Sequence, residues 1–238
     1  MHCHVIVASA RQRSEYGIDE LLASMDAAGV EAAICSVMGD DQTSENDFIA
    51  AASEPHHGRL YGYINLDPRD PQSALAELAR RVGDPCFVGI KLHPANHAYF
   101  PFAERFRPLY SAIEKTGMPV LWHSGTYPNS TPLQIAAVAL EHPGMPCVLG
   151  HFGLTDFAAE SVAAARLAAN VYADTSIQTS LPLMRAFIDE IGPQRLLWGS
   201  DFPLYVTGYE LAKVALLELA PADRELVAGG NARRLYRI

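Results

Sequence analysis

Short apolar segments alternate with longer amphipathic segments from one end of this 238-residue chain to the other. In the first amphipathic segment, Ile18, Leu21, Leu22 and Met25 follow the i, i+3, i+4, i+7 spacing of a helix, and Gly29 stands where that helix would end. The strand-like segments are residues 3–8, 32–38, 60–66, 86–92, 119–123, 146–150, 171–174 and 196–198. The later helix-like segments are residues 44–53, 71–82, 102–116, 132–141, 155–170, 181–191 and 209–219.

This alternation predicts an α/β fold with a parallel sheet, because parallel strands need helical crossovers. Eight strand–helix pairs in a chain of this length are typical of a (β/α)₈ TIM barrel, and a doubly wound open sheet is the alternative. The pattern keeps its character throughout, so we expect one domain over residues 1–238. Almost nothing precedes His2, so either the first strand is short or incomplete, or the natural chain begins upstream.

Composition narrows the class of partner. The chain carries 18 Lys and Arg against 27 Asp and Glu, a formal net charge of −9, and has no basic run. This charge disfavours nucleic acid and anionic membrane surfaces as partners. No apolar run approaches the ~20 residues that span a bilayer, and the N-terminus lacks the features of a leader, so we expect a cytoplasmic protein. The cysteines Cys3, Cys35, Cys86 and Cys147 are dispersed, which indicates buried free thiols.

Polar side chains recur at the ends of the predicted strands. His2 and His4 lie on the first strand, where a period of two directs both imidazoles to one face. His123, His151 and Asp201 follow the fifth, sixth and eighth strands. Strand ends converge on one mouth of a barrel, so we expect these residues to be neighbours. Three imidazoles and one carboxylate, from His2, His4, His123 and Asp201, would suit zinc or another borderline divalent metal.

Each residue alone has a simpler interpretation. The pair of histidines at the start of the chain resembles a frayed terminus, and His123 and His151 could each be a buried, hydrogen-bonded histidine. Asp201 could cap the next helix, as Asn231 could cap the last one. Their joint occurrence at the same end of successive strands favours a metal site. The glycines beside His151 also indicate that the backbone passes close to another group.

The chain resembles the amidohydrolase superfamily, and more closely its amidohydrolase-related branch, which includes aminocarboxymuconate semialdehyde decarboxylase, resorcylate-type decarboxylases and pyrone-dicarboxylate lactonase. The resemblance covers essentially the whole length and is specific for the superfamily rather than for one reaction. It rests on the motifs HCH at 2–4, GIKLHP at 89–94, WHSG at 122–125, GHFG at 150–153, VYADTS at 171–176, LWGSDFP at 197–203 and GNARRL at 230–235.

The resemblance implies one metal bound by His2, His4, His123 and Asp201. It also implies acid–base catalysis by His151 beside a metal-bound water, which Asp201 would orient. In two-metal relatives a carboxylated lysine occupies the position of Lys91. The sequence around Lys91 is common in the one-metal branch, so we expect a single metal. Asp174 is expected to orient a helix terminus or a metal ligand rather than to bind the metal.

Other residues are candidates for contact with substrate. We assign Lys91 and His93 to substrate binding, with a barrel lysine whose stem packs on apolar surface as the alternative for Lys91. Arg11, Arg13 and Tyr127 could meet a substrate carboxylate, although a solvated loop is the simpler interpretation for the arginines. His97, Tyr99 and Phe100 form an aromatic group that either lines the mouth or covers a helix. The segment after the first strand is short, which leaves the mouth open or closed by a second subunit.

We therefore expect a metal-dependent hydrolase. It would act on an amide, ester or lactone of a small, carboxylated molecule through a metal-activated water, with Zn²⁺ as the first choice of metal and Mn²⁺ as the second. One alternative is a non-oxidative decarboxylase of a small aromatic or unsaturated acid. A further alternative is a metal-binding barrel without turnover. The partner is a small molecule, and a homodimer is possible.

Overall fold

Eight parallel strands form one sheet whose spatial order follows the chain, β1 to β8. The computed structural model describes residues 2–5, 17–37, 39 and 41–238. The strands lie within two residues of the predicted segments, except that residues 6–8 of the first predicted strand lie outside the described residues, and the sheet of eight parallel strands in chain order confirms the barrel. Their bounds are β1 His2–Val5, β2 Ala33–Val37, β3 Leu60–Asn65, β4 Phe87–Leu92, β5 Val120–His123, β6 Cys147–Gly150, β7 Val171–Asp174 and β8 Leu196–Leu197.

The first and last strands are joined by the segment that follows β8. The N–H of His4 donates to the carbonyl of Phe202 at 2.7 Å, and the N–H groups of Ser200 and Asp201 both donate to the carbonyl of His2 at 3.0 Å. β1 has four residues, which confirms the expected short first strand. These bonds bring Asp201 beside the two histidines of β1, although the residues lie at opposite ends of the sequence.

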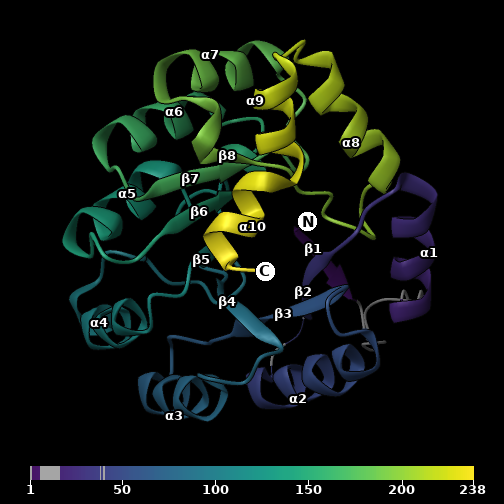
Figure 1. The fold of residues 1–238 in the computed structure, drawn as a ribbon. Coiled ribbons are helices and arrows are strands. Elements are labelled where there is room, and N and C mark those ends of the chain that lie inside the picture. Colours follow the sequence, from purple (N-terminus) through teal and green to yellow (C-terminus); the bar gives the residue numbers. More distant parts are fainter. Residues whose placement is uncertain (1, 6–16, 38, 40) are drawn as a thin grey trace.

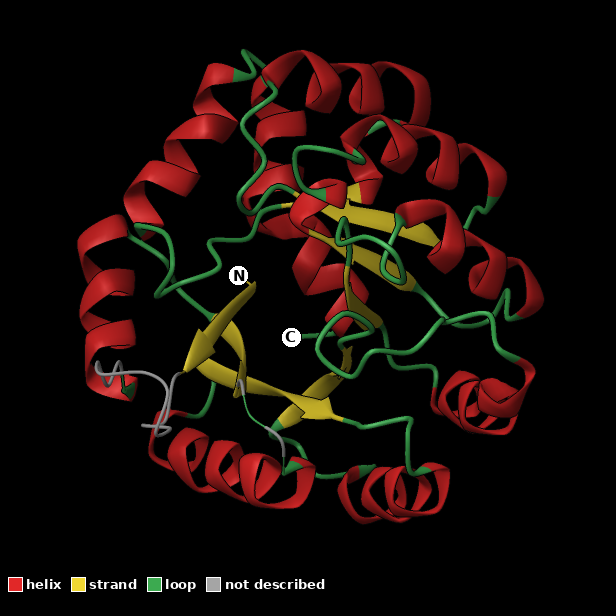
Figure 2. Cartoon of the chain, turned by 180° about the vertical axis from the view of Figure 1, so that it is seen from behind, coloured by secondary structure: helices red, strands yellow, loops and turns green. Residues whose placement is uncertain are grey.

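Helices surround the strands (Figures 1 and 2). Local sequence fixes several helix ends: Gly29 takes the left-handed conformation that ends α1, and Asp70 caps α3 by accepting the N–H of Ser73. The helices are α1 Ile18–Ala28, α2 Gln42–Ser53, α3 Pro71–Arg81, α4 Arg107–Thr116, α5 Pro132–Glu141, α6 Ala158–Leu167, α7 Leu181–Ile191, α8 Thr207–Leu216, α9 Pro221–Glu225 and α10 Asn231–Tyr236.

The barrel interior holds an apolar cluster distinct from the larger core, which includes residues of both strands and helices. Figure 1 shows α10 lying across one end of the barrel, and its Tyr236 hydroxyl lies 3.1 Å from that of Tyr63 on β3. α10 therefore forms a floor beneath the interior. The buried members of this cluster are Ile34, Tyr63, Leu121, Val148, Leu197, Ala232 and Tyr236.

Asn231 does not cap the closing helix as expected. It is the first residue of α10, and its side-chain amide donates to the carbonyls of Pro193 at 2.7 Å and Leu196 at 2.8 Å. Buried carbonyls at the entry to β8 need donors, and this need decides the role of the amide. Asn231 thereby ties α10 to the base of β8.

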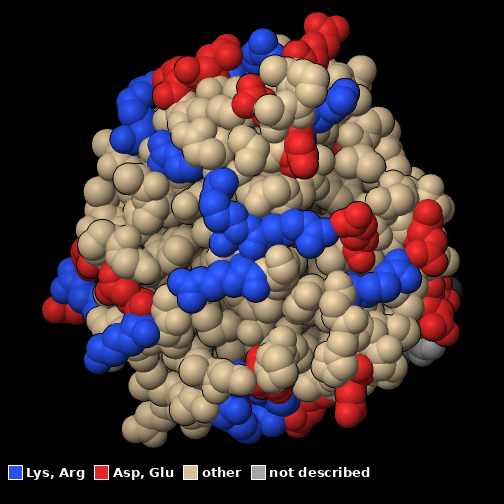
Figure 3. Space-filling model, in the orientation of Figure 1, with Lys and Arg blue, Asp and Glu red and all other residues tan. Residues whose placement is uncertain are grey.

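Charged groups of both signs lie on the face that carries α10. Figure 3 shows basic side chains crossing the middle of this face, where α10 lies, and acidic side chains around it. The guanidinium group of Arg233 on α10 pairs with Glu31, and that of Arg234 donates to the carbonyl of Gln194 at 2.9 Å. Among the helices that the structure describes, none has the length and apolar character needed to cross a membrane.

Candidate active site and metal centre

Three predicted ligands meet beside β1, which carries two of them, while the third follows β8. The Nε2 atoms of His2 and His4 lie 3.3 Å apart, and Oδ1 of Asp201 lies 3.1 Å from Nε2 of His4 and 3.9 Å from Nε2 of His2. All three side chains are buried. The two imidazoles share one face of β1, as the period of two predicts, while Cys3 between them belongs to the larger core.

Asp174 at the end of β7 fixes the orientation of His2. Its Oδ2 lies 2.9 Å from Nδ1 of His2, and its Oδ1 accepts the backbone N–H groups of His151 and Ser176 at 3.1 and 2.9 Å. An ionised carboxylate only accepts, so Nδ1 of His2 is the donor and its Nε2 presents a lone pair. Asp174 therefore orients a candidate ligand, as expected from the sequence.

The tautomer of His151 follows from its neighbours. The hydroxyl of Ser176 donates to Oδ1 of Asp174 at 2.5 Å. The Oγ atom of Ser176 also lies 2.9 Å from Nδ1 of His151. A hydroxyl has one hydrogen, so Nδ1 of His151 must be the donor in the second contact. Nε2 of His151 therefore carries a lone pair and is able to act as a base. The ring centroids of His151 and His2 lie 5.3 Å apart.

Electrostatics leave the imidazoles of His4 and His151 neutral and the carboxylates of Asp174 and Asp201 ionised. Burial lowers the pKa of His4 to about 4 and that of His151 to about 3. Burial opposes ionisation of Asp174, yet the His2 imidazole beside it holds the pKa of this carboxyl well below its usual range. Burial likewise opposes ionisation of Asp201, and the His4 imidazole beside it lowers its pKa.

This donor set fits a divalent cation. Two imidazole nitrogens bound to one zinc-sized ion at ~2.0–2.1 Å are separated by about 3 Å, which is close to the separation of the His2 and His4 Nε2 atoms. Ser36 Oγ lies 2.8 Å from Nδ1 of His4, so it can accept that proton and leave Nε2 of His4 for a metal. The ligand atoms of His2, His4 and Asp201 all lie within 4.8 Å of one another.

His123, the fourth predicted ligand, lies outside this group of close donor atoms. Its Nε2 is 2.8 Å from the hydroxyl of Thr126, and its ring packs edge-on against His151 with centroids 4.9 Å apart. His93 stacks on the other side of His123 with centroids 4.0 Å apart. The structure thus brings His123 to the mouth of the barrel, and its role as a ligand stays a prediction.

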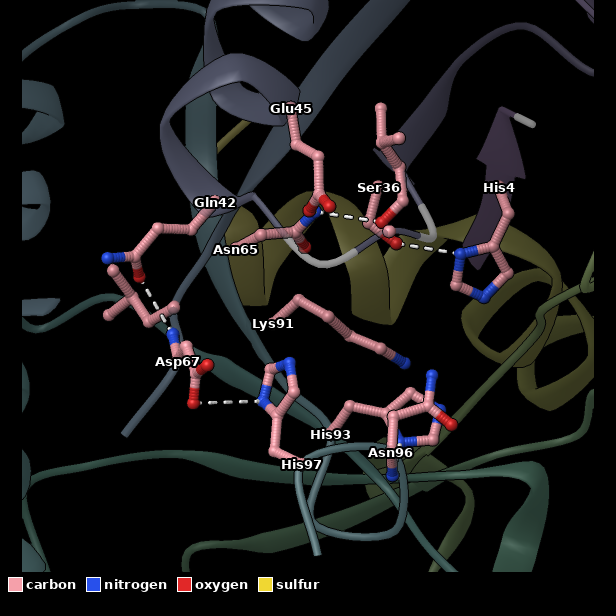
Figure 4. A pocket seen from close by; sticks show the side chains of 13 residues that line it. His4, Ser36, Gln42, Glu45, Asn65, Asp67, Lys91, His93, Asn96 and His97 are labelled. Atoms are coloured by element: carbon pink, nitrogen blue, oxygen red, sulfur yellow. Dashed lines mark hydrogen bonds and ion pairs between the residues drawn. The ribbon is translucent and has the colours of Figure 1, made fainter. Parts of the chain in front are cut away.

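A pocket of about 450 Å³, including its open mouth, adjoins His4 (Figure 4). Lys91 extends into it between His4 and His93, and its buried amine has no hydrogen-bond partner among the residues that the structure describes. Burial lowers the pKa of Lys91 to about 8, against the opposing effect of Asp201 and Asp174. The other residues that line this pocket include Ser36, Gln42, Glu45, Asn65, Asp67, Asn96 and His97.

His93 presents a hydrogen-bond donor to the same pocket. Its Nδ1 accepts the backbone N–H of Asn96 at 3.1 Å, and burial lowers the pKa of its imidazole to about 2. The neutral ring therefore carries its proton on Nε2. Lys91 and His93 together supply N–H groups suited to an anionic or carbonyl oxygen.

Backbone geometry around the site is constrained. A Cβ at Gly150 would lie 2.7 Å from the carbonyl oxygen of Trp122, which confirms the close approach that the glycines beside His151 indicated. His151 and Asp201 themselves have φ values of 64° and 53°, a region uncommon for residues other than glycine. Strained backbone of this kind concentrates at functional sites.

The remaining candidates are placed differently. Arg11 and Arg13 lie outside the described residues, and Tyr127 is exposed. The expected aromatic group does not form one surface, because Tyr99 is buried against Phe106 while Phe100 is half exposed.

Sequence reasoning missed Ser36 and Ser176. The signal for Ser36 is a hydroxyl within an otherwise apolar strand, and the parallel register of β1 and β2 places this residue directly opposite His4. The signal for Ser176 is its place two residues after Asp174, just beyond the end of β7. Neither signal identifies the histidine that the hydroxyl contacts, because that depends on the neighbouring strands.

The sequence profile of the amidohydrolase family matches residues 1–238, and the chain belongs to this family. It is therefore an amidohydrolase-family barrel with a group of side chains that could hold a divalent metal. Its curated relatives include gamma-resorcylate decarboxylases. The Polaromonas sp. enzyme is 21% identical over 96% of this chain and 86% of its own length, and that from Rhodococcus jostii is 21% identical over 94% and 85%.

Solved structures support the same fold. A 2,6-dihydroxybenzoate decarboxylase complexed with 2,6-dihydroxybenzoate has a TM-score of 0.81 at 21% identity, covering 99% of this chain and 97% of the other. The dihydroxybenzoic acid decarboxylase from Polaromonas sp., with manganese and 2-nitroresorcinol bound, has a TM-score of 0.80 at 19% identity, covering 99% and 95%.

These relatives overturn the expected hydrolase function and leave the expected zinc without support. The hydrolase assignment is wrong, because the curated relatives that match nearly the whole chain are decarboxylases. A constellation of histidines and an aspartate around one metal serves either reaction, so the residues alone could not separate them. A divalent metal is supported, but zinc is not confirmed, since manganese is the metal named in the related structures.

Proposed function

We propose that the protein catalyses non-oxidative decarboxylation of a small hydroxylated aromatic carboxylic acid. The observation that carries the proposal is the match of gamma-resorcylate decarboxylases over 94–96% of the chain. The site supports it, because buried acid–base groups adjoin a pocket that contains an amine and an imidazole N–H. An acid with an oxygen substituent on its ring suits such a pocket.

The reaction balances without an oxidant or reductant. An aromatic carboxylate and one proton give the arene and carbon dioxide. The bond between the ring and the carboxyl carbon breaks, and its electron pair stays on the ring carbon that receives the proton. The protein must therefore supply a proton at that carbon and hold the carboxylate in place while the bond breaks.

His2, His4 and Asp201 would hold the metal, with His123 as a fourth candidate ligand. A bound divalent cation would supply Lewis-acid polarisation of substrate oxygen atoms. Asp174 keeps Nε2 of His2 directed toward this group, and Ser36 does the same for His4. Mn²⁺ is our first choice of metal because two related decarboxylase structures contain it.

Asp201 is our candidate proton donor and His151 our candidate base. Asp201 is ionised in the free protein, and an anionic substrate beside it would raise its pKa and lead it to take up a proton. It would then deliver that proton to the ring carbon. His151, with its Nε2 lone pair, would accept the proton of a ring hydroxyl and return it after carbon dioxide leaves. Electron density from the oxygen favours protonation of the ring.

Lys91 and His93 would bind the acid. Each presents N–H groups to the pocket, and the amine of Lys91 finds no hydrogen-bond partner among the described residues. A substrate carboxylate would provide the acceptor that this buried amine lacks, which is a favourable exchange for an unsatisfied donor. We therefore expect replacement of Lys91 to affect KM more than kcat.

The test is release of carbon dioxide from 2,6-dihydroxybenzoate and related hydroxybenzoates by Mn²⁺-loaded protein. We expect turnover by the parent, loss of both metal and turnover in Asp201→Asn, and a raised KM in Lys91→Met. Asp189→Asn, on the exposed surface of α7, is the matched control for the aspartate. Metal-loaded protein that leaves the whole panel intact would refute the proposal.

A further inference from the structure

A buried ion pair on α8 contacts the loop that follows β7, residues 175–178. Nζ of Lys213 lies 2.5 Å from Oε2 of Glu210 and donates to the carbonyls of Thr175 and Gln178 at 3.0 and 2.9 Å. Oε2 of Glu210 accepts the N–H of Ile177 at 3.2 Å. The pair therefore binds three backbone groups of one short loop.

Burying an ion pair costs free energy, so we ask which conformation this pair fixes. Glu210 is 0% exposed and Lys213 4% exposed, and burying two charges removes strong hydration. Ile177 has a φ of 65°, a left-handed conformation that a β-branched residue seldom adopts. The N–H of Ile177 donates to Glu210, so the ion pair contacts the loop at the residue with this uncommon conformation.

The same loop carries the residue that orients the candidate base. Ser176 donates to Asp174 and accepts from Nδ1 of His151, so its position sets the tautomer of His151. Gln178 also donates to the carbonyl of Leu154, in the turn that follows His151. Hydrogen bonds at both ends, joined by the backbone of this loop, thus connect Lys213 on α8 with the ring of His151 and the carboxylate that orients His2.

Docking of α8 has other support. The hydroxyl of Ser24 on α1 donates to that of Thr207 on α8 at 2.7 Å, and Val214 of α8 is buried in the larger core. Helix packing of this kind needs no buried charge. The contacts that Glu210 and Lys213 add are all directed at the 175–178 loop.

We propose that Glu210 and Lys213 are positioning residues, which hold the 175–178 loop so that Ser176 keeps His151 as a base with its proton on Nδ1. The catalytic part of this inference rests on the proposed decarboxylase function. The structural part, that α8 sets the His151 tautomer, stands apart from the reaction.

The test compares Lys213→Met with Thr207→Val, a buried residue of the same helix that does not reach the loop. Imidazole ¹⁵N NMR of the full chain, loaded with Zn²⁺ as a diamagnetic probe, reports the His151 tautomer, with His151→Asn used for assignment. We expect a single Nδ1–H form in the parent and in Thr207→Val, and a mixture in Lys213→Met. With Mn²⁺, kcat of Lys213→Met should fall ~10–100-fold with KM unchanged, as for partners that orient active residues.

A Lys213→Met protein that keeps the parent spectrum and the kcat of Thr207→Val would overturn the inference. If Lys213→Met does not fold, because Glu210 is left charged and unpaired, the double variant Glu210→Gln/Lys213→Met is measured in the same way and decides. A changed tautomer without decarboxylation in any protein would refute the proposed function and keep the positioning role. Decarboxylation by the parent with no change of tautomer in the variants would do the reverse.

Discussion

Nδ1 of His2 donates to Oδ2 of Asp174 at 2.9 Å, although the two residues are 172 positions apart in the chain. The bond joins the first strand of the barrel to the seventh, and β8 lies between these two strands. It gives His2 one tautomer and one orientation before any metal arrives. The candidate metal site is therefore organised in part by a residue that need not bind the metal.

Asp174→Asn should weaken metal binding by ~10–100-fold, as for other residues that orient a ligand. Both carboxylate oxygens of Asp174 accept hydrogen bonds, whereas an amide has only one acceptor oxygen and turns a donor toward His2 or toward the N–H of His151. Titration of Mn²⁺ by calorimetry measures the change. Asp189→Asn should bind Mn²⁺ as the parent does, and an unaltered Kd in Asp174→Asn would contradict the orienting role.

His151→Asn should retain the metal and lose turnover. His151 lies beside His2 but is absent from the group formed by His2, His4 and Asp201, so removing its ring leaves those donors in place. Loss of an acid–base group costs ~10²–10⁴ in kcat. Elemental mass spectrometry and a decarboxylation assay give the two quantities. His57→Asn, an exposed histidine, serves as control, and loss of metal from His151→Asn would make His151 a ligand.

The cysteines should resist thiol reagents until the protein unfolds. All four are free and buried. A hydrogen bond to Cys3 and burial raise the pKa of Cys35, and burial raises that of Cys147 to about 12. Because thiolate is the reactive form, native protein should react with Ellman's reagent far more slowly than protein in guanidinium. Ala51→Cys, on the exposed side of α2, should add one fast thiol, and fast reaction of the parent would contradict the burial.

Acid should destabilise the fold partly through Glu77. Burial opposes its ionisation, but hydrogen bonds from Arg80 and Asn46 hold its pKa below the ordinary value of 4.5. A lowered folded pKa means that the stabilisation is present above pH 4.5 and is lost as the pH falls through the folded pKa. Urea unfolding of Glu77→Gln should therefore show a shallower loss of stability below pH 4.5 than the parent. Glu104→Gln, on the surface, should follow the parent.

The barrel was predictable because its signals are local. The spacing of Ile18 to Met25 and the stop at Gly29 each depend on neighbouring residues, and the structure confirms that helix. The grouping of His2, His4 and Asp201 was predictable in outline, since strand ends in a barrel share one mouth. Which of the predicted ligands lie in the close group was not, because side-chain contacts such as that of His123 with Thr126 are not encoded in spacing.

The sequence could not predict whether the reaction is hydrolysis or decarboxylation. Hydrolysis and decarboxylation both need a polarising metal and a proton carrier, so His151 and Asp201 suit either. The prediction for Asn231 was wrong for a related reason. An asparagine at a helix start suits a cap, but its side-chain amide donates to carbonyls of residues far away in the sequence. Both cases depend on what tertiary structure brings to a residue.

Helix α10 closes one end of the barrel, with Tyr236 in contact with Tyr63 beneath the site. A barrel closed at one end is open to solvent only at the other. The acid substrate and the carbon dioxide and arene made from it would therefore use the same open end. Helix α10, which supplies none of the groups proposed to react, would then restrict the substrate and both products to the opposite end of the barrel.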